Sequence, residues 1–221
     1  MCGRFTLRAS PTEIAEAFEL LRDLFECERP RFNIAPTQSI LAVRAGSDGR
    51  EAARMRWGLI PSWAKDTKLA ASMINARAET VAEKPAFRAA FKRRRCLVPV
   101  SGFYEWQRDG KTKVPYLISL CREKLFAFAG LWEKWKSPEG ELIESCTVLT
   151  TSPNELMATI HDRMPVILKP SDYGAWLDPQ LEDASALSKL LASYPSDEMR
   201  VEQVSDVVNN ARNEVDPRFS R

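Results

Sequence analysis

The fold class follows from residues 96–151, CLVPVSGFYEWQRDGKTKVPYLISLCREKLFAFAGLWEKWKSPEGELIESCTVLTT. Strand-like runs, rich in β-branched and aromatic residues, lie at 96–106, 114–120, 125–131 and 142–150. Turn signals separate most of these runs, the clearest being Asp109-Gly110 and Pro138-Glu139-Gly140. Consecutive strands joined by short turns pair in antiparallel fashion, so this stretch predicts a curled, barrel-like and mainly antiparallel sheet.

Strands and helices alternate irregularly outside this stretch. Residues 31–36 are expected to be irregular, whereas 39–44, 54–59 and 166–169 are predicted to be strands. The segment 62–80 shows no sustained period, which predicts a loop that carries Asn75. Helices are expected to dominate 171–193. We therefore predict an α+β fold, with residues 1–221 forming a single domain and helices flanking the sheet.

Two helix starts are marked by local signatures. SPTE at 10–13 supplies an N-cap serine, a proline at the first helical position and a glutamate that closes a capping box. The apolar face of this helix is predicted to consist of Ile14, Phe18 and Leu21. SPNE at 152–155 repeats the signature and predicts a helix that runs to about residue 161.

The composition excludes several classes of protein. The chain is 44% hydrophobic and 28% charged, which is typical of a soluble globular protein. No run approaches eighteen apolar residues and the N-terminus turns polar at once, so we expect a cytoplasmic protein without a membrane span or secretory signal. Five cysteines without a Cys-x-x-Cys pair, and a single histidine, predict neither a disulfide framework nor a metal site. We also expect no cofactor, and a monomer.

The charge is unevenly distributed although its sum is only +2. Residues 84–95 include six basic side chains and no acidic one, and a helix is predicted from 85 to about 94. The basic run at 92–95 has two interpretations. It is either a solvated helix end favoured by the helix dipole or a phosphate-binding patch.

Cys2 follows the initiating methionine. If Met1 is removed, as the small side chain at position 2 favours, Cys2 carries a free amine beside its thiol. Roughly a tenth of an α-amine is neutral and nucleophilic at pH 7. Such an amine attacks an aldehyde to give an imine, and the neighbouring thiol can then close a five-membered thiazolidine ring.

Four short segments carry more polar and reactive residues than packing requires: CGRF (2–5), NAR (75–77), GFYEW (102–106) and HDRMP (161–165). RFNIAP (31–36), RWGLIP (56–61) and VVN (207–209) accompany them in a fixed order. In content, order and spacing these motifs resemble the SOS-response-associated peptidase (SRAP) family across nearly the whole chain. That family includes hydroxymethylcytosine-binding proteins that shield abasic sites in single-stranded DNA.

The resemblance implies that Cys2 forms a thiazolidine crosslink with the ring-opened abasic sugar. It further implies that Asn75, Glu105 and His161 complete the catalytic set. A carboxylate such as Glu105 can deprotonate the amine and later protonate the leaving hydroxyl. His161 can protonate the sugar ring oxygen as the aldehyde opens, while Asn75 orients oxygen atoms. Taken singly, each has a structural alternative: a helix-end cap for His161, a surface strand for Glu105 and a turn for Asn75.

DNA contact is predicted for side chains within or near the motifs. The arginines Arg4, Arg77 and Arg163 are expected to hold phosphates. Trp63 and Trp106 are expected to contact bases, and Asn33 and Pro36 to shape the pocket. The expected partner is single-stranded DNA with abasic sites, with replication or repair proteins as candidate partners.

Three functions remain open at this point. The first is crosslinking to abasic sites, with weak strand-cleaving lyase activity through the imine. The second is an N-terminal-nucleophile peptidase that acts on its own leader or on other peptides, with the thiol of Cys2 activated by His161 or Glu105. The third is a binding module for modified bases in which Cys2 only packs. The sequence does not separate thiol from amine roles.

Overall fold

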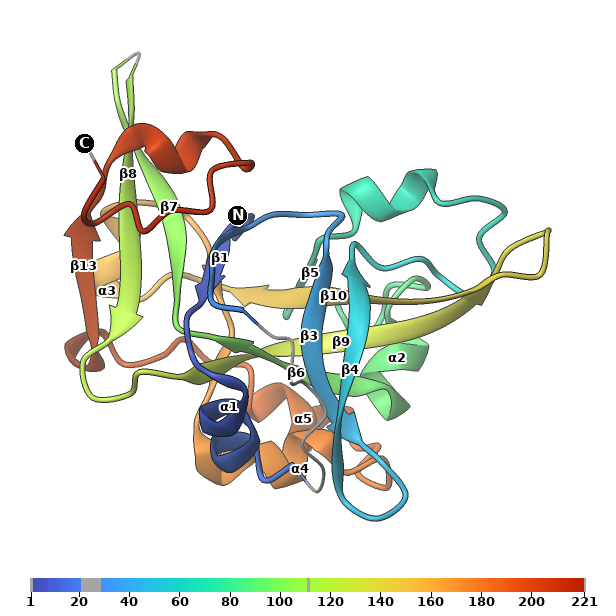
Figure 1. Cartoon of the computed structure of the whole chain (residues 1–221). Coiled ribbons are helices and arrows are strands. Elements are labelled where there is room, and N and C mark those ends of the chain that lie inside the picture. Colours follow the sequence, from blue (N-terminus) through green and yellow to red (C-terminus); the bar gives the residue numbers. More distant parts are fainter. Residues whose placement is uncertain (1, 21–28, 111, 221) are drawn as a thin grey trace.

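The computed structural model describes residues 2–20, 29–110 and 112–220, and its strands form two sheets (Figure 1). The first sheet is antiparallel throughout and has the order β13-β8-β7-β1-β2. Its strands are β1 (Phe5–Leu7), β2 (Arg31–Ile34), β7 (Gly102–Asp109), β8 (Thr112–Leu120) and β13 (Met199–Gln203). The short strand β1 therefore lies inside this sheet, between β2 and β7.

The second sheet closes on itself. Its main strands are β3 (Ser39–Ala45), β4 (Arg50–Trp57), β6 (Arg95–Val100), β9 (Phe126–Lys136) and β10 (Leu142–Thr151). Each pairs with two of the others, and the ring closes because β10 pairs in parallel with β4 and in antiparallel fashion with β9. Three short strands extend it: β5 (Asn75–Arg77), β11 (Met164–Pro165) and β12 (Ile167–Leu168). The predicted α+β fold with a barrel-like, mainly antiparallel sheet is confirmed.

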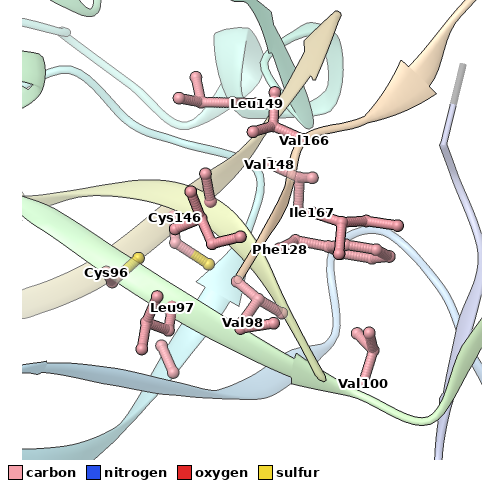
Figure 2. Packing of buried hydrophobic residues seen from close by; sticks show 14 of the residues in the cluster. Cys96, Leu97, Val98, Val100, Phe128, Cys146, Val148, Leu149, Val166 and Ile167 are labelled. Carbon is pink, nitrogen blue, oxygen red and sulfur yellow. The ribbon is translucent and has the colours of Figure 1, made fainter. Parts of the chain in front are cut away.

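The barrel interior is filled by apolar side chains from β6, β9 and β10. Figure 2 shows Val98, Phe128 and Val148 among the buried residues of this cluster. The ring of Phe5 on β1 lies 5.1 Å from that of Trp57 and 6.1 Å from that of Phe128, measured between centroids. Strand β1 is thus packed directly on the barrel, which fixes the position of the residues before it.

Helices are short and peripheral (Figure 1). They are α1 (Pro11–Phe18), α2 (Arg88–Arg93), α3 (Glu155–Ala158), α4 (Tyr173–Leu177) and α5 (Ala184–Lys189). Single 3-10 turns occur at η1 (Lys68–Ser72), η2 (Pro170–Asp172), η3 (Ser196–Glu198) and η4 (Asp206–Asn209).

The capping box that opens α1 is confirmed, since Ser10 and Glu13 bond each other's main-chain N–H groups. Ile14 and Phe18 are buried as predicted, while Leu21 lies outside the described residues. The prediction for the second helix is wrong in its bounds. Asn154, rather than Ser152, is its N-cap and accepts a 2.9 Å hydrogen bond from the main chain of Met157, and α3 has only four residues.

Several strand predictions need correction. The run 96–106 is two strands in different sheets, divided at Ser101, whose N–H donates to the carbonyl of Thr6 at 2.7 Å. Strand β4 ends at Trp57 because Gly58 has φ +126°, and a Cβ there would lie 2.6 Å from the Ala70 carbonyl oxygen.

Other corrections concern very short strands. Residues 31–34 and 75–77, predicted to be irregular and loop, are strands β2 and β5. Of the run predicted at 166–169, Ile167 and Leu168 form strand β12, whereas Val166 lies between β11 and β12 and donates its N–H to the carbonyl of Leu149 on β10. All of these depend on pairing with remote strands, which local periodicity does not reveal.

The basic run at the end of α2 is structural. Arg93 bonds Glu182 and Arg94 bonds Glu133, each at 2.8 Å. Arg95 is buried and donates to main-chain carbonyls, including that of Phe91 at 2.7 Å. These contacts favour the helix-end interpretation over a phosphate patch.

Candidate active site

The four residues expected to act in catalysis come from distant segments and converge at the start of β1. Phe5 pairs with Phe103, and the N–H of Tyr104 donates to the carbonyl of Arg4 at 2.9 Å. The antiparallel register therefore carries the chain before β1 past Glu105 on β7. From the other side, the amide nitrogen of Asn75 donates to the carbonyl of Cys2 at 2.8 Å.

The C-terminal end of β10 pairs with both β5 and β11 and so positions the segments that carry Asn75 and His161. Asn75 pairs with Val148 in the parallel β5–β10 ladder. Two residues further along, β11 pairs with Thr150 and Thr151 on the same strand. The loop that carries His161 immediately precedes β11, so one strand end positions both Asn75 and His161 near the N-terminus.

Cys2 is fully buried, with 0% of its surface exposed. Burial raises the pKa of its thiol well above the usual range, and the negative charge of Glu105 raises it further. A hydrogen bond from the main-chain N–H of Arg4 opposes this rise without cancelling it. The thiol is therefore protonated at neutral pH, which disfavours a thiolate nucleophile.

Glu105 is also buried, at 3% exposure. Burial raises the pKa of its carboxyl above the ordinary value, and the charge of His161 opposes the rise. A carboxyl with a raised pKa exchanges protons more readily near neutral pH, as acid–base catalysis requires. Glu105 therefore lies within electrostatic reach of both Cys2 and His161, and Glu105 and His161 line the same cleft.

His161 lies one turn beyond α3 and its side chain is 25% exposed. Its Nδ1 accepts a 3.0 Å hydrogen bond from the main-chain N–H of Arg163 and lies 2.9 Å from Asp162 Oδ1. With Nδ1 accepting, the neutral imidazole carries its proton on Nε2.

A cleft of about 390 Å³ opens beside these groups. Its lining comprises Arg4, Glu105, Trp106, Arg108, Lys113, His161 and Asn209. The indole nitrogen of Trp106 donates to Asn209 Oδ1 at 2.7 Å, and the Arg4 guanidinium lies 5.7 Å from the Trp106 ring centre. The cleft thus combines an acid–base pair with cations and one flat side chain.

Asn33 holds one wall of this cleft in place. Its side chain is buried and donates to the carbonyls of Val208, Asn210 and Asn213 at 3.3, 2.9 and 3.0 Å. It also accepts a 2.7 Å hydrogen bond from Arg4. We call residues 205–217, which carry these carbonyls, the C-terminal strap.

The other expected DNA-contacting residues do not line the cleft. Arg77 is exposed on β5, and Arg163 is held by Glu79 through hydrogen bonds of 2.6 and 2.9 Å. Pro36 is partly exposed in the turn after β2, and Trp63 is 59% exposed on a separate loop. Of the seven residues expected to touch DNA, the cleft lining therefore includes Arg4 and Trp106.

Arg108 and Lys113 are cleft residues that the sequence reasoning missed. They face each other across the β7–β8 hairpin, as Trp106 faces Pro115. A charged residue at a hairpin is unremarkable in sequence, and only the pairing register brings both cations to this cleft. Asn209 lies within VVN, a motif already noted, although its bond to Trp106 was not expected.

A larger cavity of about 680 Å³ lies elsewhere, lined by residues that include Arg8, Ser101, Ser119, Arg200 and Arg218. Cys2, Glu105 and His161 do not line it. In the part of the chain that the structure describes, no group of three His, Cys, Asp or Glu side chains could hold a metal ion. Within the same residues, no helix is long and apolar enough to cross a membrane.

Comparison with known proteins adds a family and close relatives. A family model described as SOS response associated peptidase (SRAP) matches residues 1–211. The abasic site processing protein YoqW of Bacillus subtilis is 49% identical over 215 residues, covering 96% of both chains. The abasic site processing protein HMCES of Xenopus tropicalis is 34% identical, covering 96% of this chain and 76% of its own. A crystal structure of a Bacteroides thetaiotaomicron protein superposes with a TM-score of 0.90 at 27% identity, over 100% of both chains.

Proposed function

Since the chain belongs to the SOS response associated peptidase (SRAP) family, we propose that it recognises abasic sites in single-stranded DNA and crosslinks itself to them through Cys2. The observation that carries the proposal is the convergence of Asn75, Glu105 and His161 around the buried Cys2. The names of the relatives, which are abasic site processing proteins, support the same substrate.

The reaction begins with removal of Met1, which lies outside the described residues, to free the amine of Cys2. His161 donates a proton to the ring oxygen of the abasic sugar as the ring C–O bond breaks, and the anomeric hydroxyl releases its proton, through water, back to His161 as the aldehyde forms. The amine lone pair then attacks the aldehyde carbon to give a carbinolamine. Glu105 accepts the proton that the nitrogen loses and passes it to the former carbonyl oxygen, which becomes the hydroxyl of the carbinolamine.

Loss of water follows. Glu105 takes the remaining proton from the nitrogen and delivers it to the carbinolamine hydroxyl, the C–O bond breaks, water leaves and a C=N bond forms. The buried position of Glu105 suits this exchange, because burial raises the pKa of its carboxyl and so favours the protonated form more than exposure to water would. The product is an imine between Cys2 and the sugar.

Ring closure makes the link stable. The thiol sulfur bonds to the imine carbon while the thiol proton passes to the nitrogen, so a thiazolidine forms and no redox partner is needed. A thiol that remains protonated until this step, as the burial of Cys2 favours, brings its own proton to the nitrogen. The imine also acidifies the neighbouring sugar C–H, which provides for weak strand cleavage.

The peptidase alternative uses the thiol of Cys2 as the attacking group. That role requires a thiolate, and burial together with Glu105 opposes thiolate formation in the folded chain. Cys2→Ser separates the two functions, since serine keeps the amine but is a poor ring-closing group. We expect an imine that borohydride can trap, without a stable crosslink. Loss of both products would count against the amine mechanism.

The direct test is denaturing electrophoresis of the purified protein with a single-stranded oligonucleotide that contains one abasic site. We expect a shifted band with the wild-type protein, and none with Cys2→Ala or with undamaged DNA. Intact mass must first show that the chain starts at Cys2. With Met1 absent and no shifted band, the proposal would be wrong.

A further inference from the structure

The mouth of the active-site cleft carries two exposed cations that the crosslinking chemistry does not use. Arg108 on β7 and Lys113 on β8 line the cleft together with Glu105 and His161. They lie near the end of the β7–β8 hairpin, which extends from the body of the molecule next to the C-terminal strap (Figure 1).

These two cations differ from the arginines nearer the reacting groups. Arg4 donates to Asn33 and to the carbonyl of Val208, each at 2.7 Å. Arg163 is paired with Glu79 at 2.6 Å. By contrast, the side chains of Arg108 and Lys113 make no ion pair or hydrogen bond with any residue that the structure describes.

The register places the two like charges directly opposite each other. Arg108 pairs with Lys113 across the antiparallel ladder, so their side chains lie on the same face of the hairpin. Like charges in this position repel each other and destabilise the pairing. An anion bound between them removes that repulsion, and a phosphodiester chain supplies such anions at regular intervals.

We propose that Arg108 and Lys113 bind the phosphates of the DNA strand next to the abasic nucleotide. Trp106 lies two residues before Arg108 on the same face of β7, with the Arg4 guanidinium 5.7 Å from its ring. A strand that leaves the reacting sugar thus meets a flat side chain for a base and then a cationic pair for its backbone. The hairpin acts as a guide for the strand, separate from the crosslinking groups.

This inference rests on the proposed function, so its test separates binding from chemistry. The probe is a fluorescent single-stranded oligonucleotide with a tetrahydrofuran abasic analogue, which has no aldehyde and cannot crosslink. Binding is measured by fluorescence anisotropy at salt concentrations from about 0.05 to about 1 M, a range wide enough to define the slope of log Kd against log salt concentration. The variant is Arg108→Ala with Lys113→Ala, and the matched control is Lys134→Ala with Lys136→Ala on β9, which removes the same charge from exposed positions of the barrel.

Loss of two phosphate contacts should reduce the log–log salt slope by about 1.4, because each contact contributes about 0.7 on single strands. This corresponds to a roughly 25-fold rise in Kd at 0.1 M salt relative to 1 M. The control should keep the wild-type slope and Kd. An unchanged slope in the hairpin variant, or an equal change in the control, would overturn the inference.

Crosslinking to a true abasic site at saturating DNA is the second readout. The hairpin variant should reach the same maximal rate as the wild-type protein, because neither cation belongs to the reacting cluster, and this also shows that the variant is folded. A reduced maximal rate at saturation would contradict a role in guiding the strand. Failure of the wild-type protein to crosslink would disprove the proposed function. The salt dependence of binding would still show whether Arg108 and Lys113 contact phosphates.

Discussion

Asn75 donates a 2.8 Å hydrogen bond from its side-chain amide to the main-chain carbonyl of Cys2. The bond orients the Cys2–Gly3 peptide group and with it the amine and thiol on the adjacent Cα. Its other atom, Asn75 Oδ1, is buried and has no hydrogen-bond partner within the described chain. An unsatisfied buried acceptor beside the nucleophile is well placed to take a hydrogen bond from a sugar hydroxyl.

Asn75→Ala should slow crosslinking by roughly ten- to a hundredfold, because the nucleophile loses its fixed orientation. The variant should also lose about 1–3 kcal/mol of stability through the unsatisfied carbonyl. Initial rates on denaturing gels and urea unfolding measure the two effects. Asp183→Ala is the control, since it removes the 2.8 Å cap bond to the Ser185 N–H at the start of α5, a helix that carries none of the candidate site residues. Equal slowing in both variants would reduce Asn75 to a structural role.

Glu105→Gln should slow imine formation by about 10²–10⁴-fold, the usual contribution of general acid–base catalysis. It should also change how stability depends on pH. Burial raises the pKa of Glu105 in the folded chain above its ordinary value of 4.5, so the folded state binds the proton more tightly than the unfolded state. The contribution of Glu105 to the free energy of unfolding is therefore fully present below pH 4.5, and it is lost as pH rises through the pKa of Glu105 in the folded chain.

The measurement is urea unfolding of wild type and Glu105→Gln at a series of pH values. The variant should gain stability relative to the wild type as pH rises above the ordinary carboxyl pKa. A constant difference across the series would mean that the carboxyl does not titrate in the expected sense.

Arg77→Ala should flatten the salt dependence of single-strand binding by about 0.7 in log–log slope, because Arg77 is exposed and suited to one phosphate contact. Arg163→Ala provides the comparison. Its guanidinium already bonds Glu79 and the carbonyl of Thr150, the latter at 2.6 Å, and its N–H holds His161. An unchanged slope for Arg77→Ala would remove it from the phosphate-binding set.

Asn33→Ala should destabilise the protein by about 2–3 kcal/mol, since four hydrogen bonds of a buried amide are lost together. Asn213→Ala, which removes a single 3.0 Å bond to the Val207 carbonyl, should cost about 1 kcal/mol. Hydrogen exchange of the strap amides should accelerate more in the first variant than in the second. Equal costs would show that Asn33 does not anchor the strap.

Local chemistry explains which features could be predicted from the sequence. The start of α1 was predicted correctly because Ser10 and Glu13 satisfy each other's main-chain groups within four residues. Cys2, Asn75, Glu105 and His161 could be proposed because their types and motif contexts are unusual. No local pattern in the sequence predicts that these four side chains converge. Their convergence results from the pairing of β1 with β7 and of β5 with β10.

Features that depend on long-range register could not be predicted. Strand β5 exists because Asn75 pairs with Val148, a residue far along the chain. Asn33 fixes the C-terminal strap by donating to main-chain carbonyls. Because every residue has such a carbonyl, the sequence does not indicate which ones Asn33 bonds. Arg108 and Lys113 lie opposite each other because of the β7–β8 register, which no local pattern in the sequence reveals.

The complete burial of Cys2 in the folded chain bears on when Met1 is removed during synthesis. Phe5 finds its partner Phe103 only when β7 has left the ribosome, which at about 5–20 residues per second is roughly 5–20 s after β1 emerges. Until then the N-terminus belongs to an open nascent chain, on which an aminopeptidase can remove Met1. In the proposed mechanism a chain that keeps Met1 has an acylated amine and cannot crosslink, so we expect the reactive fraction of the protein to equal the fraction that has been processed.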